Sequence, residues 1–246
     1  MENKSIEDVK DSFCHKFSLK TDASREFEIK PLQKEHLELV IDLTCKVFAE
    51  REPLGVFLGA TAESWRPSIR GVAERSIEEN MGVICVESKT GNIAVIVMCY
   101  DVYNEQLKPV YPASEDLPQQ QIDEVLLKVE EGDFIEVNKP FDAIELFTLV
   151  SIDGYQGLGL AKETVNWLIH SHPIVTKVKA VGSAVTNPAT KAIMEKAGAK
   201  TVKTINLLEY KNNAGEAVFS GITEAIETKL KISDYKEVAY CVYVRK

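Results

Sequence analysis

The sequence predicts a mixed α/β domain, and three observations support this class. Apolar runs of strand-like composition alternate with segments whose apolar residues recur at helical spacing. Along the chain these elements follow the order β-α-α-β-β-β-α-β-α-β-β. The 45% hydrophobic share over 246 residues is typical of a soluble globular core, and we expect a single domain over residues 26–246.

The N-terminal part of the chain predicts two helices and three strands. Residues 1–25 are polar with little periodicity, so we expect an extension there and a first strand at EFEIKPL. Apolar residues from Leu37 to Phe48 mark one face of a helix, which Pro53 breaks. A second helix carries Trp65 on its apolar face. The strands MGVICVES and NIAVIVMCYDVY follow, and the residues between them predict a hairpin turn.

The C-terminal part alternates strands with helices after an interruption. Residues 104–141 are expected to form an insertion of proline-bearing loops around a short helix that Gly132 ends. Asn187 and Pro188 suit the start of a later helix, with Asn as the N-cap and Pro in the first helical position. A helix-like segment, ITEAIETKL, separates the last two strands. The four strands are predicted at AIELFTLVSI, KVKAVGSAV, TVKTINLLEY and EVAYCVYV.

Charge and composition argue against several classes of partner. The net charge of −9 argues against nucleic acid and favours cationic small molecules. No apolar run approaches the roughly 20 residues of a membrane span, and the N-terminus has no apolar secretory region. The five cysteines are scattered without a CxxC pair, which predicts reduced thiols in a cytoplasmic protein and no metal site. We expect a monomer or a weak homodimer.

Three glycines lie at a junction between a strand and a helix, in the stretch GYQGLGLAKET from Gly154 to Thr164. The free N–H groups at such a helix start can bind an anion, and glycine lets a ligand approach the backbone closely. The glycine spacing matches neither the P-loop nor the dinucleotide-binding pattern, and no acidic residue ends the next strand. A glycine-rich turn that only packs strand against helix remains an alternative.

Gln156, Gly159 and Ala161 match the pattern Q/R-x-x-G-x-G/A. This segment resembles the coenzyme A pyrophosphate loop of the GNAT superfamily of N-acetyltransferases, and the order of elements from about residue 26 is similar to that fold. The helix NPATKAIMEKAGA resembles the superfamily helix that borders the cofactor. Within the superfamily, VFAEREPLGVFLG is similar to the E-P-L segment of insect-type arylalkylamine N-acetyltransferases.

The resemblance implies a central, mostly antiparallel, twisted sheet with splayed middle strands and flanking helices. It also implies acetyl-CoA as the co-substrate, with the thioester in the gap between LFTLV and KAVGSAV. The pantetheine arm would pair with Leu149, Val150 and Ser151, and Asn187 would border the cofactor. The pyrophosphate would bind the loop, which comprises Gln156, Gly157, Leu158, Gly159, Leu160 and Ala161.

The same resemblance suggests the catalytic residues. An ammonium has no lone pair, so a base must remove the amine proton, and Glu52 of the E-P-L segment is the first candidate. Glu145 is the second, because a carboxylate inside an apolar strand must face a cleft, an edge or a partner. Many superfamily members use a tyrosine acid where this chain has Met194, and hydroxyls at Thr186 and Thr190 occupy the alternative positions. Both threonines are better explained as helix-capping or surface residues.

The predicted function is transfer of an acetyl group from acetyl-CoA to a primary amine, by direct attack in a ternary complex. The acceptor would be a small arylalkylamine or a polyamine. A protein or peptide N-acetyltransferase, and a catalytically silent acyl-CoA-binding module, remain open as alternatives.

Overall fold

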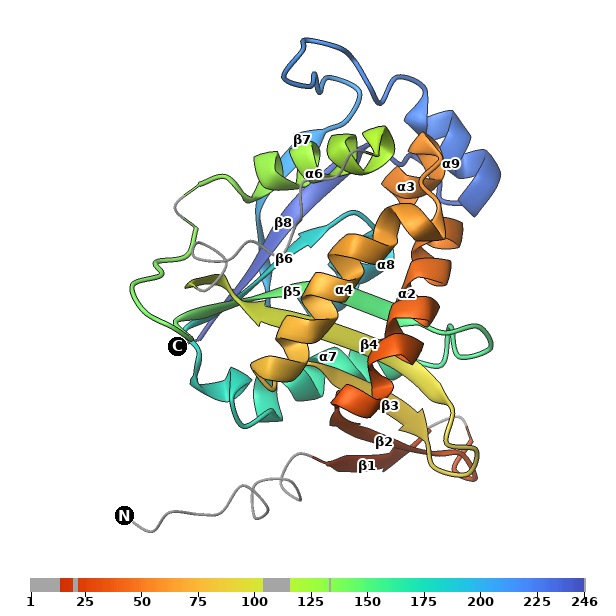
Figure 1. The fold of residues 1–246 in the computed structure, drawn as a ribbon, viewed down its shortest axis with the longest axis vertical. Helices are drawn as coiled ribbons and strands as arrows, with labels where there is room; N and C mark the ends of the chain where they lie inside the picture. The colour runs from red at the N-terminus through yellow and green to blue at the C-terminus, as the bar shows by residue number, and fades with distance from the viewer. Residues whose placement is uncertain (1–13, 20–21, 104–115, 133, 246) are drawn as a thin grey trace.

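The computed structural model describes residues 14–19, 22–103, 116–132 and 134–245. Its described strands form one mixed sheet of eight strands in the order β1-β2-β3-β4-β5-β6-β8-β7 (Figure 1). Every neighbouring pair is antiparallel except β5 and β6, which are parallel. The predicted fold class is therefore confirmed. The strands are β1 His15–Ser18, β2 Glu26–Pro31, β3 Val83–Glu87, β4 Ile93–Asp101, β5 Ala143–Ser151, β6 Ala180–Val185, β7 Lys200–Asn206 and β8 Glu237–Val244.

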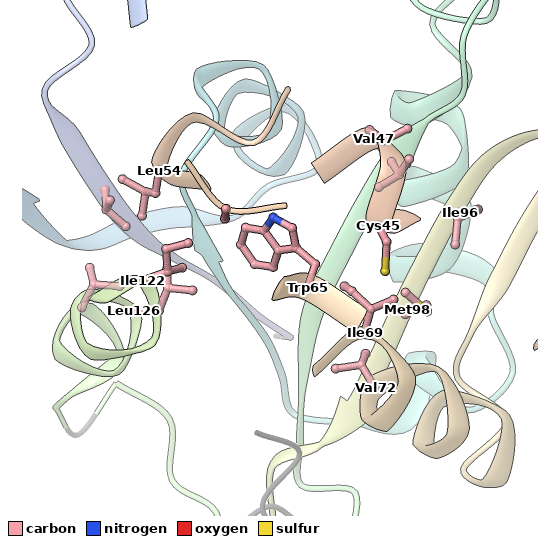
Figure 2. Packing of buried hydrophobic residues seen from close by; sticks show 14 of the residues in the cluster. Cys45, Val47, Leu54, Trp65, Ile69, Val72, Ile96, Met98, Ile122 and Leu126 are labelled. Atoms are coloured by element: carbon pink, nitrogen blue, oxygen red, sulfur yellow. The ribbon is translucent and has the colours of Figure 1, made fainter. Parts of the chain in front are cut away.

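Helices cover both faces of the sheet and enclose two hydrophobic clusters. One face packs against α2 Leu37–Arg51, α3 Pro53–Leu58, α4 Ala62–Glu78, α6 Leu117–Glu130 and α9 Ile222–Leu230. The other face packs against α7 Leu160–Ser171 and α8 Pro188–Lys196. In Figure 2, Trp65 of α4 lies between the residues of α6 and those of α2 and β4. Short 3-10 turns occur at η2 Lys34–His36 and η3 Val175–Lys177.

The sheet begins within the predicted N-terminal extension. The strand β1 pairs antiparallel with β2, from His15 opposite Ile29 to Ser18 opposite Glu26. Phe17 on β1 stacks against the buried ring of Phe27, with centroids 6.0 Å apart. The sequence prediction lacked this strand because four residues with one large apolar side chain give no measurable period. The single-domain organisation stays a prediction, and residues 104–115 of the expected insertion lie outside the described residues.

The middle strands separate as predicted. Parallel pairing between β5 and β6 covers only three residue pairs, from Ala143 opposite Ala180 to Glu145 opposite Gly182. Beyond this point β5 continues to Ser151, and β6 to Val185, without pairing to each other. The gap lies in the middle of the sheet, with α7 leading from one strand to the other. This arrangement opens a cavity between the two strands. No helix in the described part of the chain is long and apolar enough to cross a bilayer.

Candidate active site

A cavity of about 490 Å³ opens at the gap between β5 and β6. It receives side chains from the end of β5, the turn before α7, the end of β6 and the start of α8. Most of the predicted site residues meet here: Glu52, Leu149, Val150, Ser151, Gln156, Gly157, Gly159, Leu160, Ala161, Thr186, Asn187 and Thr190. Leu158 is not part of the wall, because its side chain packs against the hydrophobic cluster beneath α7. Glu145 lies outside this cavity.

The glycine turn gives the start of α7 an exposed backbone. Gly157 and Gly159 have φ angles of 74° and 80°, which L-residues with a side chain rarely adopt. Gly159 is the N-cap residue of α7, and no side chain caps this helix end. The Gln156 amide braces the turn, since its Oε1 accepts from the Gly154 N–H and its Nε2 donates to Asp153. The helix start is therefore available to an anion that enters the cavity.

Basic side chains around the same cavity strengthen this interpretation. Arg51, Lys162 and Lys196 line it. The Arg51 Nη2 donates to the Ser151 carbonyl at 3.2 Å and pairs with Asp153 at 3.1 Å. Sequence reasoning missed all three residues, although Lys162 directly follows the glycine pattern and Lys196 lies in the helix quoted above. Together with the turn, they suit a phosphorylated ligand in an otherwise acidic protein.

Glu52 joins the ends of two helices at the wall of this cavity. It is 8% exposed and is the N-cap of α3, where its Oε2 accepts from the Gly55 N–H. Oε1 has no well-formed hydrogen bond among the described residues, although the Thr186 hydroxyl lies near enough to stabilise the carboxylate. Burial raises the pKa of Glu52 above its ordinary value, and contacts with Gly55 and Thr186 partly offset this effect. A raised pKa favours work as a proton acceptor near neutral pH.

The buried side chains of Trp65 and Tyr235 lie near Glu52, and the sequence did not reveal Tyr235 as part of the site. A Cβ at Gly55 would lie 2.8 Å from the Trp65 ring and 3.1 Å from Glu52 Oε2, so only glycine fits there. Burial, followed by the charge of Glu52, raises the pKa of the Tyr235 hydroxyl, which is therefore protonated at neutral pH. Tyr235 precedes β8 and comes close to Glu52 only through the tertiary fold.

Glu145 lies at the point where β5 and β6 separate. It is 4% exposed, and its two oxygens accept from the Ala184 N–H and the Tyr240 hydroxyl, each at 2.9 Å. A Cβ at Gly182 would overlap the Tyr240 hydroxyl, so glycine is required for this approach. Burial, and then the charge of Glu130, raise the pKa of Glu145 well above its ordinary value. Glu145 thus satisfies a backbone N–H that strand pairing would otherwise satisfy.

Solved structures share this fold. At 15% identity, the C-terminal condensation domain of Ebony in complex with beta-alanyl-dopamine gives a TM-score of 0.72 over 89% of this chain and 99% of its own. Arylalkylamine N-acetyltransferase 2 from Aedes aegypti gives 0.66 at 15% identity, over 89% and 98%. A polyamine N-acetyltransferase from Drosophila melanogaster gives 0.65 at 10% identity, over 89% and 100%. The fold is the GNAT fold. No family model and no curated protein sequence matches the chain.

Within this GNAT fold, the helix after β6 supplies no tyrosine to the cavity. Met194 is fully buried in the cluster beneath α7 and α8. The Asn187 side chain caps α8, as predicted, by accepting from the Ala189 N–H at 2.9 Å. Thr186 and Thr190 are the hydroxyls that reach the cavity wall from this region. Their catalytic roles stay predictions. Among the described residues, no three His, Cys, Asp or Glu side chains gather as metal ligands would.

Proposed function

We propose that the protein is an N-acetyltransferase that moves an acetyl group from acetyl-CoA to a small primary amine. The observation that carries this proposal is that one cavity, in the gap between β5 and β6, is lined both by the uncapped start of α7 and by the buried carboxylate of Glu52. In the proposal the start of α7 marks the donor end of this cavity and Glu52 marks the acceptor end. The GNAT fold alone does not identify the acyl donor, because one structure with a similar fold is a condensation domain.

The donor end of the cavity suits coenzyme A. The pyrophosphate would meet the backbone N–H groups from Gly157 to Ala161, with Lys162 and Lys196 close by. Leu149, Val150 and Ser151 pair with β4 on one side and form no pair with β6 on the other, so this second side of β5 could meet the pantetheine arm. Acetyl-CoA supplies an activated thioester at the centre of the gap.

The acceptor end supplies a base. Glu52 takes the proton of the ammonium, directly or through water, so that the neutral amine can attack the carbonyl carbon. A C–N bond forms and the C–S bond breaks, and the second proton of the attacking nitrogen passes through solvent or a nearby hydroxyl to the leaving thiolate. The Thr186 hydroxyl lies near enough to stabilise the charged form of the Glu52 carboxylate.

The cysteines support direct transfer in a ternary complex. Four of the five are buried, and the described thiols do not line the cavity. Burial raises the pKa of Cys45 to about 11 and of Cys85 to about 12. A thiol acts as a nucleophile only as the thiolate, so an acetylated cysteine is disfavoured. Steady-state kinetics with intersecting lines would agree with this route, whereas parallel lines and a trapped acetyl-enzyme would contradict it.

The experiment that tests the proposal is a thiol-release assay with acetyl-CoA against a panel of amines. Release only in the presence of small amines supports the proposed function. Release with peptides alone would point to a peptide N-acetyltransferase. Tight binding of acetyl-CoA without release would identify a silent acyl-CoA-binding module. The absence of both binding and release would overturn the proposal together with its donor.

A further inference from the structure

Tyr155 lies in the turn before α7, between Gly154 and Gly157. These glycines have φ angles of 84° and 74°, and glycine gives the backbone more freedom than any other residue. The side chains between them therefore help to decide how firmly the turn is held. The half-buried ring of Tyr155 packs against the hydrophobic cluster beneath α7, and the residue also lines the cavity between β5 and β6. Tyr155 thus contacts both the core of the protein and the cavity.

The Tyr155 hydroxyl belongs to a network of charged and polar groups near one edge of the sheet. It donates to Glu87 Oε2 at 3.1 Å. The other oxygen of Glu87 accepts from Arg25 Nε at 2.8 Å, and the Thr90 hydroxyl donates to Oε2 at 2.9 Å. Glu87 ends β3, and Arg25 immediately precedes β2. One hydrogen bond therefore joins the turn before α7 to a residue 68 positions earlier in the chain.

Glu87 is well suited to hold this hydroxyl. The hydrogen bond from Arg25 lowers the pKa of Glu87 below its ordinary value. Burial opposes this effect, and the hydroxyls of Thr90 and Tyr155 add to it. Glu87 is therefore ionised at neutral pH. A hydrogen bond to a charged acceptor is stronger than one between neutral groups, so it restrains the turn more firmly than packing of the ring alone.

Ring contacts connect the same edge of the sheet to the turn and to α7. The rings of Phe27 and Tyr155 meet edge to face with centroids 6.2 Å apart. The Arg25 guanidinium lies 5.4 Å from the centroid of Phe27 and 5.6 Å from that of Tyr155. On β1, His15 stacks against Trp167 of α7 with centroids 6.3 Å apart. The first two strands therefore contact both the turn and the helix that follows it.

We propose that the N-terminal edge of the sheet positions the turn before α7 for the donor through the hydrogen bond between Tyr155 and Glu87. This inference rests on the proposed function, in which the turn binds the pyrophosphate. Tyr155 is a positioning residue, and Glu87 and Arg25 act through it, since neither of them lines the cavity. A turn already held in its bound shape loses less conformational freedom when the donor binds, and this preorganisation strengthens binding.

The test compares two tyrosines that make the same kind of bond. Tyr155→Phe removes the hydroxyl and keeps the ring, and Glu87 keeps its bond from Arg25. We expect the Kd for coenzyme A, measured by calorimetry, to rise at least about threefold. Tyr210→Phe is the matched control, because the Tyr210 hydroxyl donates to Glu124 at 3.0 Å and neither residue lines the cavity. This control should keep the wild-type Kd.

Kinetics distinguish a positioned turn from a general loss of structure. In Tyr155→Phe the KM for acetyl-CoA should rise, while kcat and the KM for the amine stay near their wild-type values. The kcat/KM for S-acetylpantetheine should not change, because this thioester has no pyrophosphate to meet the turn. Equal losses with both donors, or an unchanged Kd for coenzyme A, would overturn the inference.

A measurement without any donor separates this inference from the proposed function. Hydrogen exchange at the N–H groups from Gly157 to Ala161 reports the freedom of the turn in the free protein. Exchange should be faster in Tyr155→Phe and in Glu87→Gln, and unchanged in Tyr210→Phe. Faster exchange with weaker binding of coenzyme A supports the inference even if no amine is acetylated. Wild-type exchange in both Tyr155→Phe and Glu87→Gln would overturn it even if thiol release supports the acetyltransferase.

Discussion

The side chain of Glu52 combines a structural contact with an available oxygen. Its Oε2 caps α3, its Oε1 has no well-formed hydrogen bond among the described residues, and Glu52 lines the cavity between β5 and β6. We expect Glu52→Gln to lower kcat/KM by about a hundredfold to ten-thousandfold, since general base catalysis contributes on that scale. The isosteric amide can still accept from Gly55, so the fold and acetyl-CoA binding should be nearly unchanged. Kinetics and calorimetry on the same preparation check both parts.

The pH dependence of the rate follows from the same residue. A base acts in its deprotonated form, and the pKa of Glu52 is raised, so the wild-type rate should fall as pH drops through that raised value. Glu52→Gln should lack this acid limb. Glu145→Gln serves as the comparison. Normal activity in Glu52→Gln across pH, with loss for every amine in Glu145→Gln, would place the base on β5 instead.

Individual residues show which parts of the candidate site could be predicted from the sequence. Glu52 could be predicted because it lies in a recognisable tripeptide beside a proline. Tyr235 could not, because it stands in no distinctive local pattern and reaches Glu52 from a distant part of the chain. Glu145 was found because a charge inside an apolar strand is conspicuous, but its hydrogen bonds to Ala184 and Tyr240 depend on where the strands separate.

At the level of elements, the turn before α7 gives a clean test of the donor site. We expect Gly159→Asp to weaken acetyl-CoA binding at least about tenfold, because it places a carboxylate where a phosphate would bind. The fold should survive, since aspartate tolerates positive φ better than most residues and is favourable at a helix N-cap. Isothermal calorimetry and a thermal melt measure the two effects.

Gly154→Asp is the matched control. Gly154 has a φ of 84°, close to the 80° of Gly159, and a Cβ at either position would meet no atom within 4 Å. Gly154 does not line the cavity. Equal losses of affinity in both variants would indicate a general effect of charge or strain, and unchanged affinity in Gly159→Asp would remove the loop from the donor site.

The elements that sequence reasoning missed are the short ones. Pro53 was expected only to break α2, yet it also starts α3, because a proline suits the first helical position once Glu52 supplies the cap. The strand β1 depends on the edge of β2 rather than on its own composition. Longer elements such as α7 and β5 were predicted because their apolar periods extend over several turns or alternations.

For the whole molecule, His172 links stability to acidity. It is fully buried between α7 and η3, where its Nδ1 accepts from the N–H groups of Ile174 and Val175. Burial lowers its pKa from 6.5 to about 4. Between these values the unfolded chain binds a proton that the folded protein does not, so the free energy of unfolding falls as pH falls, by on the order of 3 kcal/mol near pH 4.

Chemical denaturation of the wild type and of His172→Asn over this pH range measures the effect. The asparagine oxygen can accept from the same N–H groups but does not titrate. We expect the variant to be less stable at neutral pH and to lose less stability on acidification. Parallel pH curves for the two proteins would show that His172 is not the group responsible.

The short parallel pairing between β5 and β6 also divides the sheet into two parts, each formed by one continuous half of the chain. Strands β1 to β5 end at Ser151, and β6 to β8 begin at Ala180. A cut between α7 and β6 would therefore leave each antiparallel strand pair whole within one fragment, and only the three parallel pairs would cross the break. An acyl donor bound in the gap between β5 and β6 would contact both fragments and would therefore favour their association. The extent of reassembly would then depend on the concentration of the donor.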